Sequence, residues 1–392
     1  MPALDNSRIR EINTLTVFRH LRRRSLATAA SLVSDTGLTR PSVASALSEL
    51  VGQGWVEALD PEQTRRGGRP ANRFRYRAES GLVLGLDIGV HRVVGTLTDL
   101  AGHRLGSIER AVAPASEPSE RLETMDRLIT DLLGETGMDS TGVWSVVAAV
   151  TGPVDQDGRT SLFSPLPGWT EVDLVGHLRG RFDCPVHVDN DVKLALLAEQ
   201  AWGAIPNASD VVYVLAGLRT GAAIMVGGQV LRGYSGAAGE IGALPAVRWH
   251  SAVGRLLDAP WLPSHLTDGE RAHQVFARAR TGDERALRAV DEYARDLATG
   301  AAALCLTIDP EVLVVGGSMV QGADLWLAEL TASLNTLVLR TPRVVASRLD
   351  SQSVALGAVR RAMIDVESTY FGQRLRPAHR LTSELITDGT SN

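Results

Sequence analysis

Residues 29–56 have the pattern of a helix-turn-helix, and this pattern constrains the N-terminal fold more than any other feature. Apolar residues at 29–33 give a first short helix one apolar side, and Gly37 supplies a turn that favours positive φ. Thr39 and Pro41 suit the N-cap and first turn of a second helix. The buried face of that second helix is predicted from helical spacing to be Val43, Ala46, Leu47 and Leu50.

The opposite face of the second predicted helix is polar and mostly short-chained. Arg40, Ser42, Ser45 and Ser48 lie on it, and such side chains enter a major groove without obstruction. Ordinary helical hairpins show the same apolar pattern, so this segment alone leaves two interpretations open. With the segment that follows, the residues predicted to contact DNA are Thr39, Arg40, Pro41, Ser42, Ser45, Arg66 and Arg69.

A basic segment follows the predicted helices and has the features of a wing. Residues 54–57 are expected to form its first strand, and residues 65–70 space arginines by glycine, as in segments that enter a minor groove. Arg73, Arg75 and Arg77 alternate with aromatic residues, which predicts a strand with a basic outer face. Residues 1–80 carry a net charge of +5 within a chain of net charge −5, which favours phosphate contacts at this end. The alternative is a solvated basic linker.

Length and composition set broad limits on the remainder. The 392 residues allow two or three domains. Neither a run of 18 apolar residues nor a signal-peptide pattern occurs, so we expect a cytoplasmic protein without a membrane partner. Cys184 and Cys305 have apolar neighbours and are expected to be thiols. Residues 373–392 are polar without an apolar period, which predicts a flexible tail.

From Gly81 onwards the pattern changes to apolar strands with glycine turns. Residues 82–89 predict a strand that ends in Asp87-Ile88-Gly89, followed by a β-meander with a turn at Ala101-Gly102. Similar strands recur at residues 211–215 and 222–226, around Gly221. Two lobes of mixed sheet are therefore expected, with a ligand cleft between them.

Several motifs of this large region resemble those of the ROK family (repressor, open reading frame, kinase). They are Asp87-Ile88-Gly89, Gly152-Pro153-Val154, Val188-Asp189-Asn190-Asp191, the glycine-rich run from Gly233 to Gly242, and the run from Asp309 to Gly317. The resemblance implies an α/β chain: an N-terminal winged helix-turn-helix, then a two-lobed domain of the actin-like, ribonuclease H-like sugar-kinase fold. The expected boundaries are 1–80 for the DNA-binding domain and basic linker, 81–372 for the ROK domain, and 373–392 for the tail. Lobe one is expected at about 81–187 plus 350–372, and lobe two at about 188–349.

The resemblance also implies roles for particular residues. Asp191 matches the general base of the family's kinases, while Asn190, Glu240 and Gly152 match its sugar site. Asp87 and Gly89 match groups that manage metal and phosphates, and Gly316 and Gly317 match the adenosine-side loop. The alternative for these glycines is that they only make the turns of the fold.

Departures from the family pattern indicate that zinc binding and phosphoryl transfer are lost. Zinc-binding members carry a histidine where this chain has Ala243, and residues 244–256 contain no cysteine, so no metal or cofactor is expected. The phosphate turn reads Gly217-Leu218-Arg219-Thr220-Gly221, whose larger side chains are expected to crowd a phosphate. The alternative is that Arg219 attracts a phosphate by its charge. Asp191 is therefore predicted to be a vestigial base that only binds ligand.

Lys193 replaces a second asparagine of the family motif and has three interpretations. Its ammonium group pairs with Asp189 or Asp191, binds an acidic ligand such as a phosphosugar, or simply lies in solvent on a helix.

The sequence thus predicts a transcriptional regulator, a repressor of carbohydrate metabolism, with a non-catalytic sensor domain. Its expected partners are a palindromic double-stranded DNA operator, a sugar or phosphosugar effector, and further copies of itself in a homodimer or homotetramer. Lobe closure relayed through residues 61–80 is the expected route of coupling. The alternatives are a bifunctional ATP-dependent sugar kinase with a DNA-binding head, and a regulator that has lost small-molecule binding.

Overall fold

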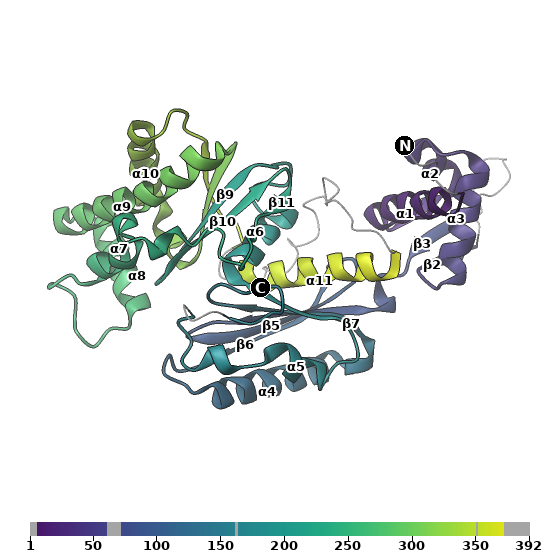
Figure 1. Cartoon of the computed structure of the whole chain (residues 1–392), viewed down its shortest axis with the longest axis horizontal. Coiled ribbons are helices and arrows are strands. Elements are labelled where there is room, and N and C mark those ends of the chain that lie inside the picture. The colour runs from purple at the N-terminus through teal and green to yellow at the C-terminus, as the bar shows by residue number, and fades with distance from the viewer. Residues whose placement is uncertain (1–5, 61–71, 161–163, 350–351, 372–392) are drawn as a thin grey trace.

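The computed structural model describes residues 6–60, 72–160, 164–349 and 352–371. One three-stranded and two five-stranded sheets organise the chain. The small sheet and its helices stand at one end of the molecule, and the two large sheets follow (Figure 1). Arg66, Arg69 and the predicted tail lie outside the described residues. No helix in the described ranges combines the length and hydropathy needed to cross a bilayer.

The N-terminal end is a winged helix-turn-helix. It consists of α1 (Asn6–Arg24), β1 (Leu26–Thr28), α2 (Ala29–Thr36), α3 (Arg40–Gly52), β2 (Val56–Leu59) and β3 (Arg73–Tyr76). Gly37 ends α2 with a φ of 69°, and the Thr39 side chain accepts a hydrogen bond from the backbone N–H of Ser42 to cap α3. The predicted apolar face of α3 is buried as expected: Val43, Ala46, Leu47 and Leu50.

The wing differs from the sequence prediction in two respects. β2 and β3 are antiparallel neighbours, so the chain passes from this sheet into lobe one only after β3, over residues 77–81, and not through a linker at 61–80. The predicted strand at Arg73–Tyr76 forms, but its basic face is partly neutralised. Arg75 donates hydrogen bonds to the carboxylates of Glu57 and Glu79, which the local alternation of residues did not reveal.

Lobe one is built on a sheet of order β6-β5-β4-β7-β8. Its strands are β4 (Leu82–Ile88), β5 (Arg92–Asp99), β6 (Arg104–Ala111), β7 (Val143–Val150) and β8 (Val186–Asn190). The predicted β-meander is β4, β5 and β6, with Gly102 at a φ of 90° in its second turn. Helices α4 (Pro118–Thr136) and α5 (Leu174–Arg179) cover one face, and α11 (Ser353–Phe371) covers the other (Figure 1).

Lobe two has a sheet of order β11-β10-β9-β12-β13. These strands are β9 (Val211–Ala216), β10 (Thr220–Val226), β11 (Gln229–Val230), β12 (Val312–Gly316) and β13 (Arg343–Ala346). Gly221 lies inside β10 rather than at a turn, because it pairs with Leu215 of β9. The outer helices are α7 (Trp249–Leu257), α8 (Asp268–Arg280), α9 (Glu284–Ile308) and α10 (Ala323–Leu337).

The boundary between the lobes lies later than expected. β8 runs to Asn190 and pairs in parallel with β7, so the first sheet includes residues 188–190 that were assigned to lobe two. The next helix, α6 (Asp191–Trp202), packs against both α11 and β10. Consequently α6 contacts both sheets.

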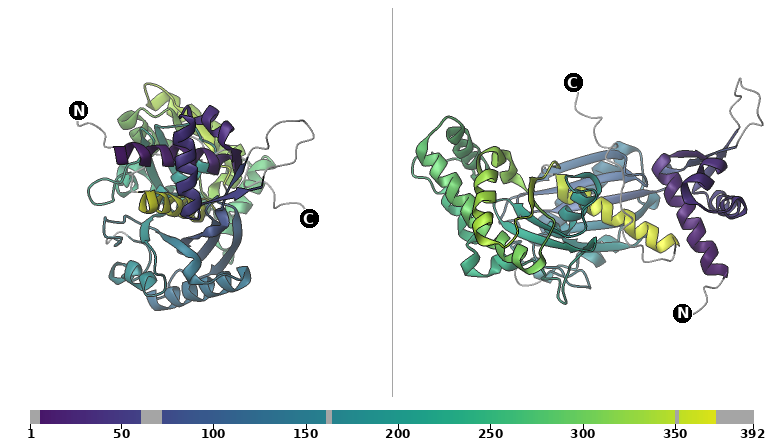
Figure 2. Two further views of the ribbon diagram at one scale, coloured as in Figure 1. Left: turned by 90° about the vertical axis from the view of Figure 1, so that its right-hand side faces the viewer. Right: turned by 90° about the horizontal axis from the view of Figure 1, so that it is seen from above.

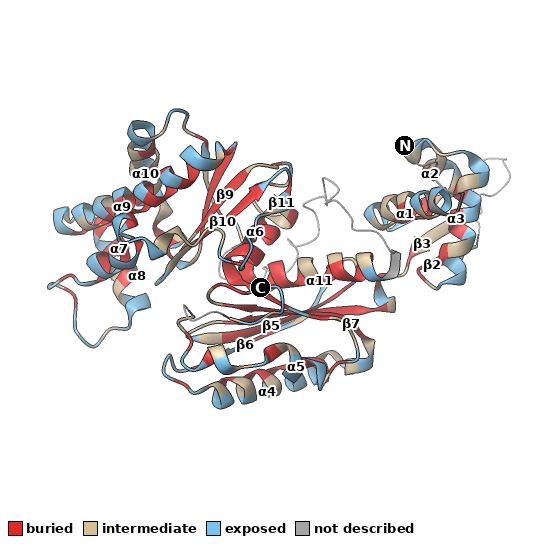
Figure 3. Cartoon of the chain, in the orientation of Figure 1, coloured by how far each residue is buried: buried red, intermediate tan, exposed pale blue. Residues whose placement is uncertain are grey.

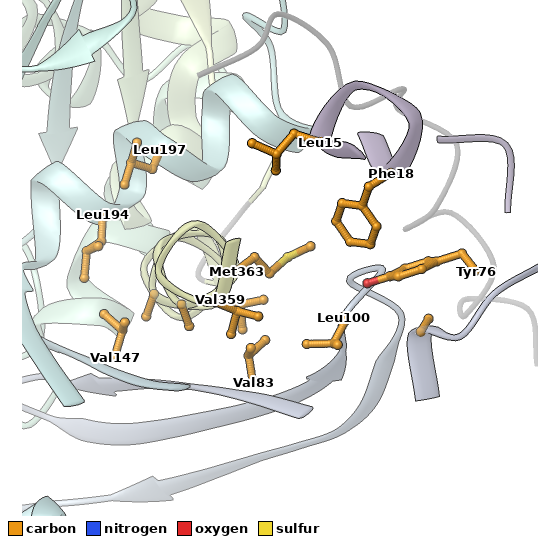
Figure 4. Packing of buried hydrophobic residues seen from close by; sticks show 14 of the residues in the cluster. Leu15, Phe18, Tyr76, Val83, Leu100, Val147, Leu194, Leu197, Val359 and Met363 are labelled. Carbon is orange, nitrogen blue, oxygen red and sulfur yellow. The ribbon is translucent and has the colours of Figure 1, made fainter. Parts of the chain in front are cut away.

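The N-terminal domain packs directly onto lobe one. Phe18 of α1 lies in one continuous apolar core with Met363 of α11, and Figure 4 shows the two side chains facing each other. Trp55 makes an edge-to-face contact with Trp144 of β7, with ring centroids 5.1 Å apart. At the same junction the Arg22 guanidinium donates to the Glu367 carboxylate of α11, and both side chains are about nine-tenths buried.

The far side of α11 completes this core. Leu194 and Leu197 of α6 line it, so α11 is buried between α6, the sheet and the N-terminal domain (Figure 4). Burial colouring shows the same pattern, with buried residues along the central strands and inner helix faces and exposed ones outside (Figure 3). The other two views place the N-terminal domain beyond the C-terminal half of α11 (Figure 2).

Candidate functional site

Several residues that the sequence singled out meet at one edge of the lobe-one sheet. β4, β7 and β8 are parallel, so their carboxyl ends share that edge. Asp87 lies near the end of β4, Gly152 follows β7, and Asn190 ends β8. The connection between the strand ends is a hydrogen bond of 2.9 Å from Asn190 Nδ2 to the carbonyl oxygen of Gly152.

The Asn190 side chain is hydrogen-bonded within the protein. Its Oδ1 accepts a hydrogen bond of 3.1 Å from the Lys193 backbone N–H, which caps the first turn of α6. Its Nδ2 donates to Asp191 Oδ1 at 3.0 Å as well as to Gly152. Both amide hydrogens are therefore used, and only the second lone pair of Oδ1 stays available to a ligand.

Three carboxyl groups form what we call the carboxylate cluster: Asp87, Asp191 and Glu240. Burial, followed by the negative charge of Asp87, raises the pKa of the Asp191 carboxyl to about 7. Burial also raises the pKa of Asp87 to about 6, and it raises the pKa of Glu240, which Lys193 opposes. Burial and the charges of Asp87 and Glu240 thus oppose ionisation of Asp191, so its protonated and ionised forms coexist near neutral pH.

Lys193 is buried, with 1 % relative exposure, which excludes the interpretation as a solvated helix lysine. Its Nζ donates to the carbonyl oxygen of Gly236 at 2.6 Å, and Asp189 and Glu240 oppose the burial that lowers the Lys193 pKa. Arg232 pairs with Asp189 at 2.6 Å. The loop that carries Glu240 is thus attached to α6 and β8 by two basic side chains.

The loop after β4 is held by a buried arginine. Arg121 of α4 is fully buried, and its Nη1 donates to the carbonyl oxygen of Gly89 at 2.6 Å. The Gly89 N–H donates to the Arg92 carbonyl oxygen at 2.9 Å. Both backbone polar groups of Gly89 are therefore used within the protein, which fixes the loop that follows Asp87.

Gly316 and Gly317 lie in lobe two, and local packing accounts for both. A Cβ on Gly316 would lie 2.0 Å from the hydroxyl oxygen of Tyr213, and Gly317 has a φ of 90°. These constraints apply whether or not a nucleotide binds. In the neighbouring turn between β9 and β10, Leu218 packs against the lobe-two core and Arg219 is exposed.

Ala243, which the sequence resemblance matches to the histidine of zinc-binding members, lies in a short 3₁₀ turn that follows Glu240. An alanine side chain offers no ligand atom. Across the described ranges, no three His, Cys, Asp or Glu side chains gather closely enough to hold a metal ion. The residues present therefore do not fit that zinc site.

The predicted DNA-binding residues of α3 lie on one surface. Thr39, Arg40, Pro41 and Ser45 are exposed, while Ser42 is half-buried and its hydroxyl lies 2.9 Å from that of Thr39. Glu49, which lies on the same face of α3 one turn after Ser45, pairs with Arg10 of α1.

Sequence reasoning missed three residues of this site: Thr151, Arg121 and Arg232. Thr151 hydrogen-bonds Asp191 and directly precedes the matched glycine. Arg121 occupies an apolar position of α4, one turn before the buried Met125, which is an unusual place for an arginine. Arg232 directly precedes the glycine-rich run, and its charge opposite Asp189 was the available signal.

Comparisons with known proteins agree with this architecture. A putative xylose repressor of Caldicellulosiruptor sp. (strain Rt8B.4) is 24% identical over 387 residues, covering 91% of this chain and 97% of that protein. A ROK family transcriptional regulator, described as a homolog of the E. coli MLC protein, superposes with a TM-score of 0.72 at 19% identity, covering 93% of this chain and 98% of that one.

A kinase superposes on less of the molecule. A ROK family glucokinase from Streptomyces griseus, in complex with glucose and AMPPNP, has a TM-score of 0.61 at 25% identity and covers 72% of this chain and 99% of its own. The family match itself spans residues 83–256 and 261–362 and begins after the winged-helix domain. The chain is therefore a member of the ROK family.

Proposed function

We propose that this protein is a transcriptional repressor that binds operator DNA through α3 and senses a sugar at the carboxylate cluster. One observation carries the proposal: a winged helix-turn-helix packs, through a shared apolar core, on the same helix α11 that supports α6 and its Asp191. Relatives named as a xylose repressor and as a ROK transcriptional regulator cover more than nine-tenths of the chain, which supports the same assignment.

We propose that α3 is the recognition helix and contacts DNA in the major groove. Arg40 is the long donor at the start of α3, and Ser42 and Ser45 are short enough to let the helix approach the bases. We further propose that two copies bind a palindromic operator, as the two-fold symmetry of helix-turn-helix dimers requires.

The proposed sensor site is the surroundings of Asp191, Glu240 and Gly152. A sugar hydroxyl donates to a carboxylate and accepts from a protonated carboxyl group, and both forms coexist in the cluster near neutral pH. Since Asn190 caps α6, it acts mainly by orienting Asp191.

The signal is proposed to pass through α11 rather than through residues 61–80. α6 begins at Asp191 and packs along α11, and α11 contacts α1 through Met363 and Glu367. A ligand that shifts α6 against α11 changes the surface of α11 on which the DNA-binding domain packs. It does so only if it binds the shifted and unshifted arrangements of the two helices with different affinity.

We also propose that the cluster does not transfer phosphoryl groups. A general base needs a lone pair directed at the substrate hydroxyl, whereas the Asp191 carboxyl group is already engaged by the protein: its Oδ1 accepts from Asn190 Nδ2 and from the Val192 N–H, and the Thr151 side chain also hydrogen-bonds it. In addition, the turn after β9 carries the exposed Arg219, whereas turns that bind phosphate through backbone N–H groups are rich in glycine.

DNA binding and sugar sensing are tested together by fluorescence anisotropy. The purified chain is titrated into labelled duplexes from the region upstream of its own gene, with and without a panel of pentoses, hexoses and amino sugars. We expect a specific dissociation constant on the order of 10⁻⁸ M, weakened by one sugar of the panel. Glu240→Ala should abolish that response and leave the unliganded affinity unchanged, because Glu240 lies far from α3 along the chain and in the fold. Failure to distinguish these duplexes from random DNA contradicts the proposal.

The second candidate function is a sugar kinase with a DNA-binding head, which the joint retention of Asp87 and Asp191 favours. Coupled ATPase assays across the same panel decide between them. Turnover that Asp191→Asn abolishes supports the kinase. An altered DNA response in Asp191→Asn, without turnover in the parent protein, supports the sensor. A flat thermal shift across the whole panel would instead support a regulator that has lost small-molecule binding.

A further inference from the structure

A cavity lies beside α11, and it is lined by other residues than those of the carboxylate cluster. Its volume is about 340 Å³, within the size range of small-molecule sites, and none of Asp87, Asp191 and Glu240 lines it. Three basic side chains line this α11 cavity: His187 of β8, Arg232 of the loop after β11, and Arg361 of α11.

Buried carboxylates orient the two arginines and leave donors unused. Arg361 Nε donates to Asp365 Oδ1 at 3.0 Å, and Asp365 is nine-tenths buried. Arg232 donates from Nε and Nη2 to Asp189 Oδ2 at 3.2 and 2.6 Å. Among the described residues, neither Arg361 Nη1 and Nη2 nor Arg232 Nη1 makes a hydrogen bond.

Three of the four carboxylate oxygens of Asp155 and Asp189, the acidic residues that line the α11 cavity, accept hydrogen bonds from the protein itself. Asp189 Oδ1 accepts from the Asn190 N–H at 2.9 Å while its Oδ2 holds Arg232. Asp155 Oδ1 accepts two backbone N–H groups, those of Asp157 and Arg159, each at 2.9 Å. The hydrogen-bonding capacity that remains is therefore mostly that of guanidinium donors, which match the oxygen atoms of phosphate and carboxylate groups.

The carboxylate cluster has the opposite character. Asp87 and Asp191 are buried and Glu240 is half-buried, and the negative charges that gather there repel a dianionic phosphoryl group, whereas the carboxyl groups accept neutral hydroxyl groups. The two sites therefore differ in the charge that they admit.

We propose that the α11 cavity is a second ligand site, which binds the phosphoryl group of a small phosphate monoester between Arg232 and Arg361. The volume exceeds that of a phosphate ion, so there is room for a polyol or sugar attached to it. Gln156 and the backbone at Gly233 and Gly236 line the remainder and provide polar partners for hydroxyl groups. This inference does not depend on whether the carboxylate cluster binds a sugar.

Isothermal titration calorimetry tests the proposal with three probes: glucose 6-phosphate, inorganic phosphate and glucose. The full chain is compared with the double variant Arg361→Gln/Asp365→Asn, which removes the cation and its buried carboxylate together; His187, whose Nε2 lies 3.6 Å from Asp365 Oδ2, keeps a polar neighbour at position 365. The matched control is Arg110→Gln/Asp131→Asn, which removes an exposed Arg–Asp pair between β6 and α4 in the same way.

We expect glucose 6-phosphate to bind the parent chain and the control alike, and the Arg361 double variant to bind it about tenfold more weakly, the loss typical of a charged hydrogen bond. Inorganic phosphate should follow the same order. The proposal is overturned if neither phosphate probe binds, or if the Arg361 double variant binds them as the parent does.

Discussion

Lys193 illustrates how a single residue changes the character of this site. In the sequence it has the position of an exposed residue in the first turn of a helix, yet its ammonium group is buried and bonded to the Gly236 carbonyl oxygen. A buried cation is retained only where it is paired and hydrogen-bonded, and Asp189 and Glu240 supply the nearby charge. Its placement depends on the loop at 233–240, which meets α6 only in the folded chain, so helical periodicity had no means of predicting it.

The raised pKa of Asp191 predicts a pH-dependent stability. Because the folded state holds a proton that the unfolded chain releases near pH 4, Asp191 contributes stability at low pH that is lost as pH rises towards 7. Asp191→Asn removes this loss. We expect the melting temperature of the variant to rise above that of the parent by several degrees at pH 8, equivalent to about 1–3 kcal/mol.

Differential scanning fluorimetry from pH 5 to pH 8 measures this difference. The gap between variant and parent should widen from pH 5 to about pH 7 and level off above it. Asp131→Asn, at an exposed carboxylate of α4, is the control and should give parallel curves. A constant gap between the Asp191→Asn variant and the parent would show that the carboxyl group titrates normally.

At the scale of single elements, α3 was the most predictable part of the chain. The Thr39 cap, Pro41 and the apolar period all act within the helix itself, and the structure reproduces its buried face. By contrast, the basic face of β3 depends on Glu57 of the neighbouring strand, which local alternation does not report. The boundary between the lobes, expected at about residue 187, was placed too early for the same reason: the pairing of β8 with β7, distant in sequence, keeps residues up to Asn190 in the first sheet.

The exposed start of α3 gives a prediction about operator recognition. Arg40→Ala should weaken specific binding roughly tenfold and relax the preference at one base position, because an arginine contact to a base is worth about 1–3 kcal/mol. Arg127→Ala on α4 is a matched control, since that arginine is exposed and pairs with Glu123 of its own helix. Selection from a randomised duplex pool, followed by anisotropy, measures both quantities. Equal loss at every base position would assign Arg40 to a phosphate instead.

At the scale of the whole molecule, the DNA-binding domain and lobe one share a core. Sequence motifs identified both domains, but their junction consists of contacts between residues far apart in the chain, such as Trp55 with Trp144 and Arg22 with Glu367. The ionic part of the junction has an excess of positive charge. Burial and Arg22 lower the pKa of the Arg360 guanidinium to about 9. Glu367 pairs with Arg22, and the neighbouring Arg360 adds a second positive charge.

Removal of Glu367 should therefore release the DNA-binding domain. Glu367→Gln leaves Arg22 buried beside Arg360 without a counter-charge, and breaking a buried pair in this way costs about 3 kcal/mol. We expect hydrogen exchange in α1 to accelerate while that in β9 and β12 stays as in the parent, because lobe two does not share this contact. The exchanged-charge variant Arg22→Glu/Glu367→Arg restores a pair and should recover most of the protection in α1. If exchange in α1 is unaffected by Glu367→Gln, apolar packing by Phe18 and Met363 alone holds the domain, and α11 transmits a ligand signal through those contacts and not through charge.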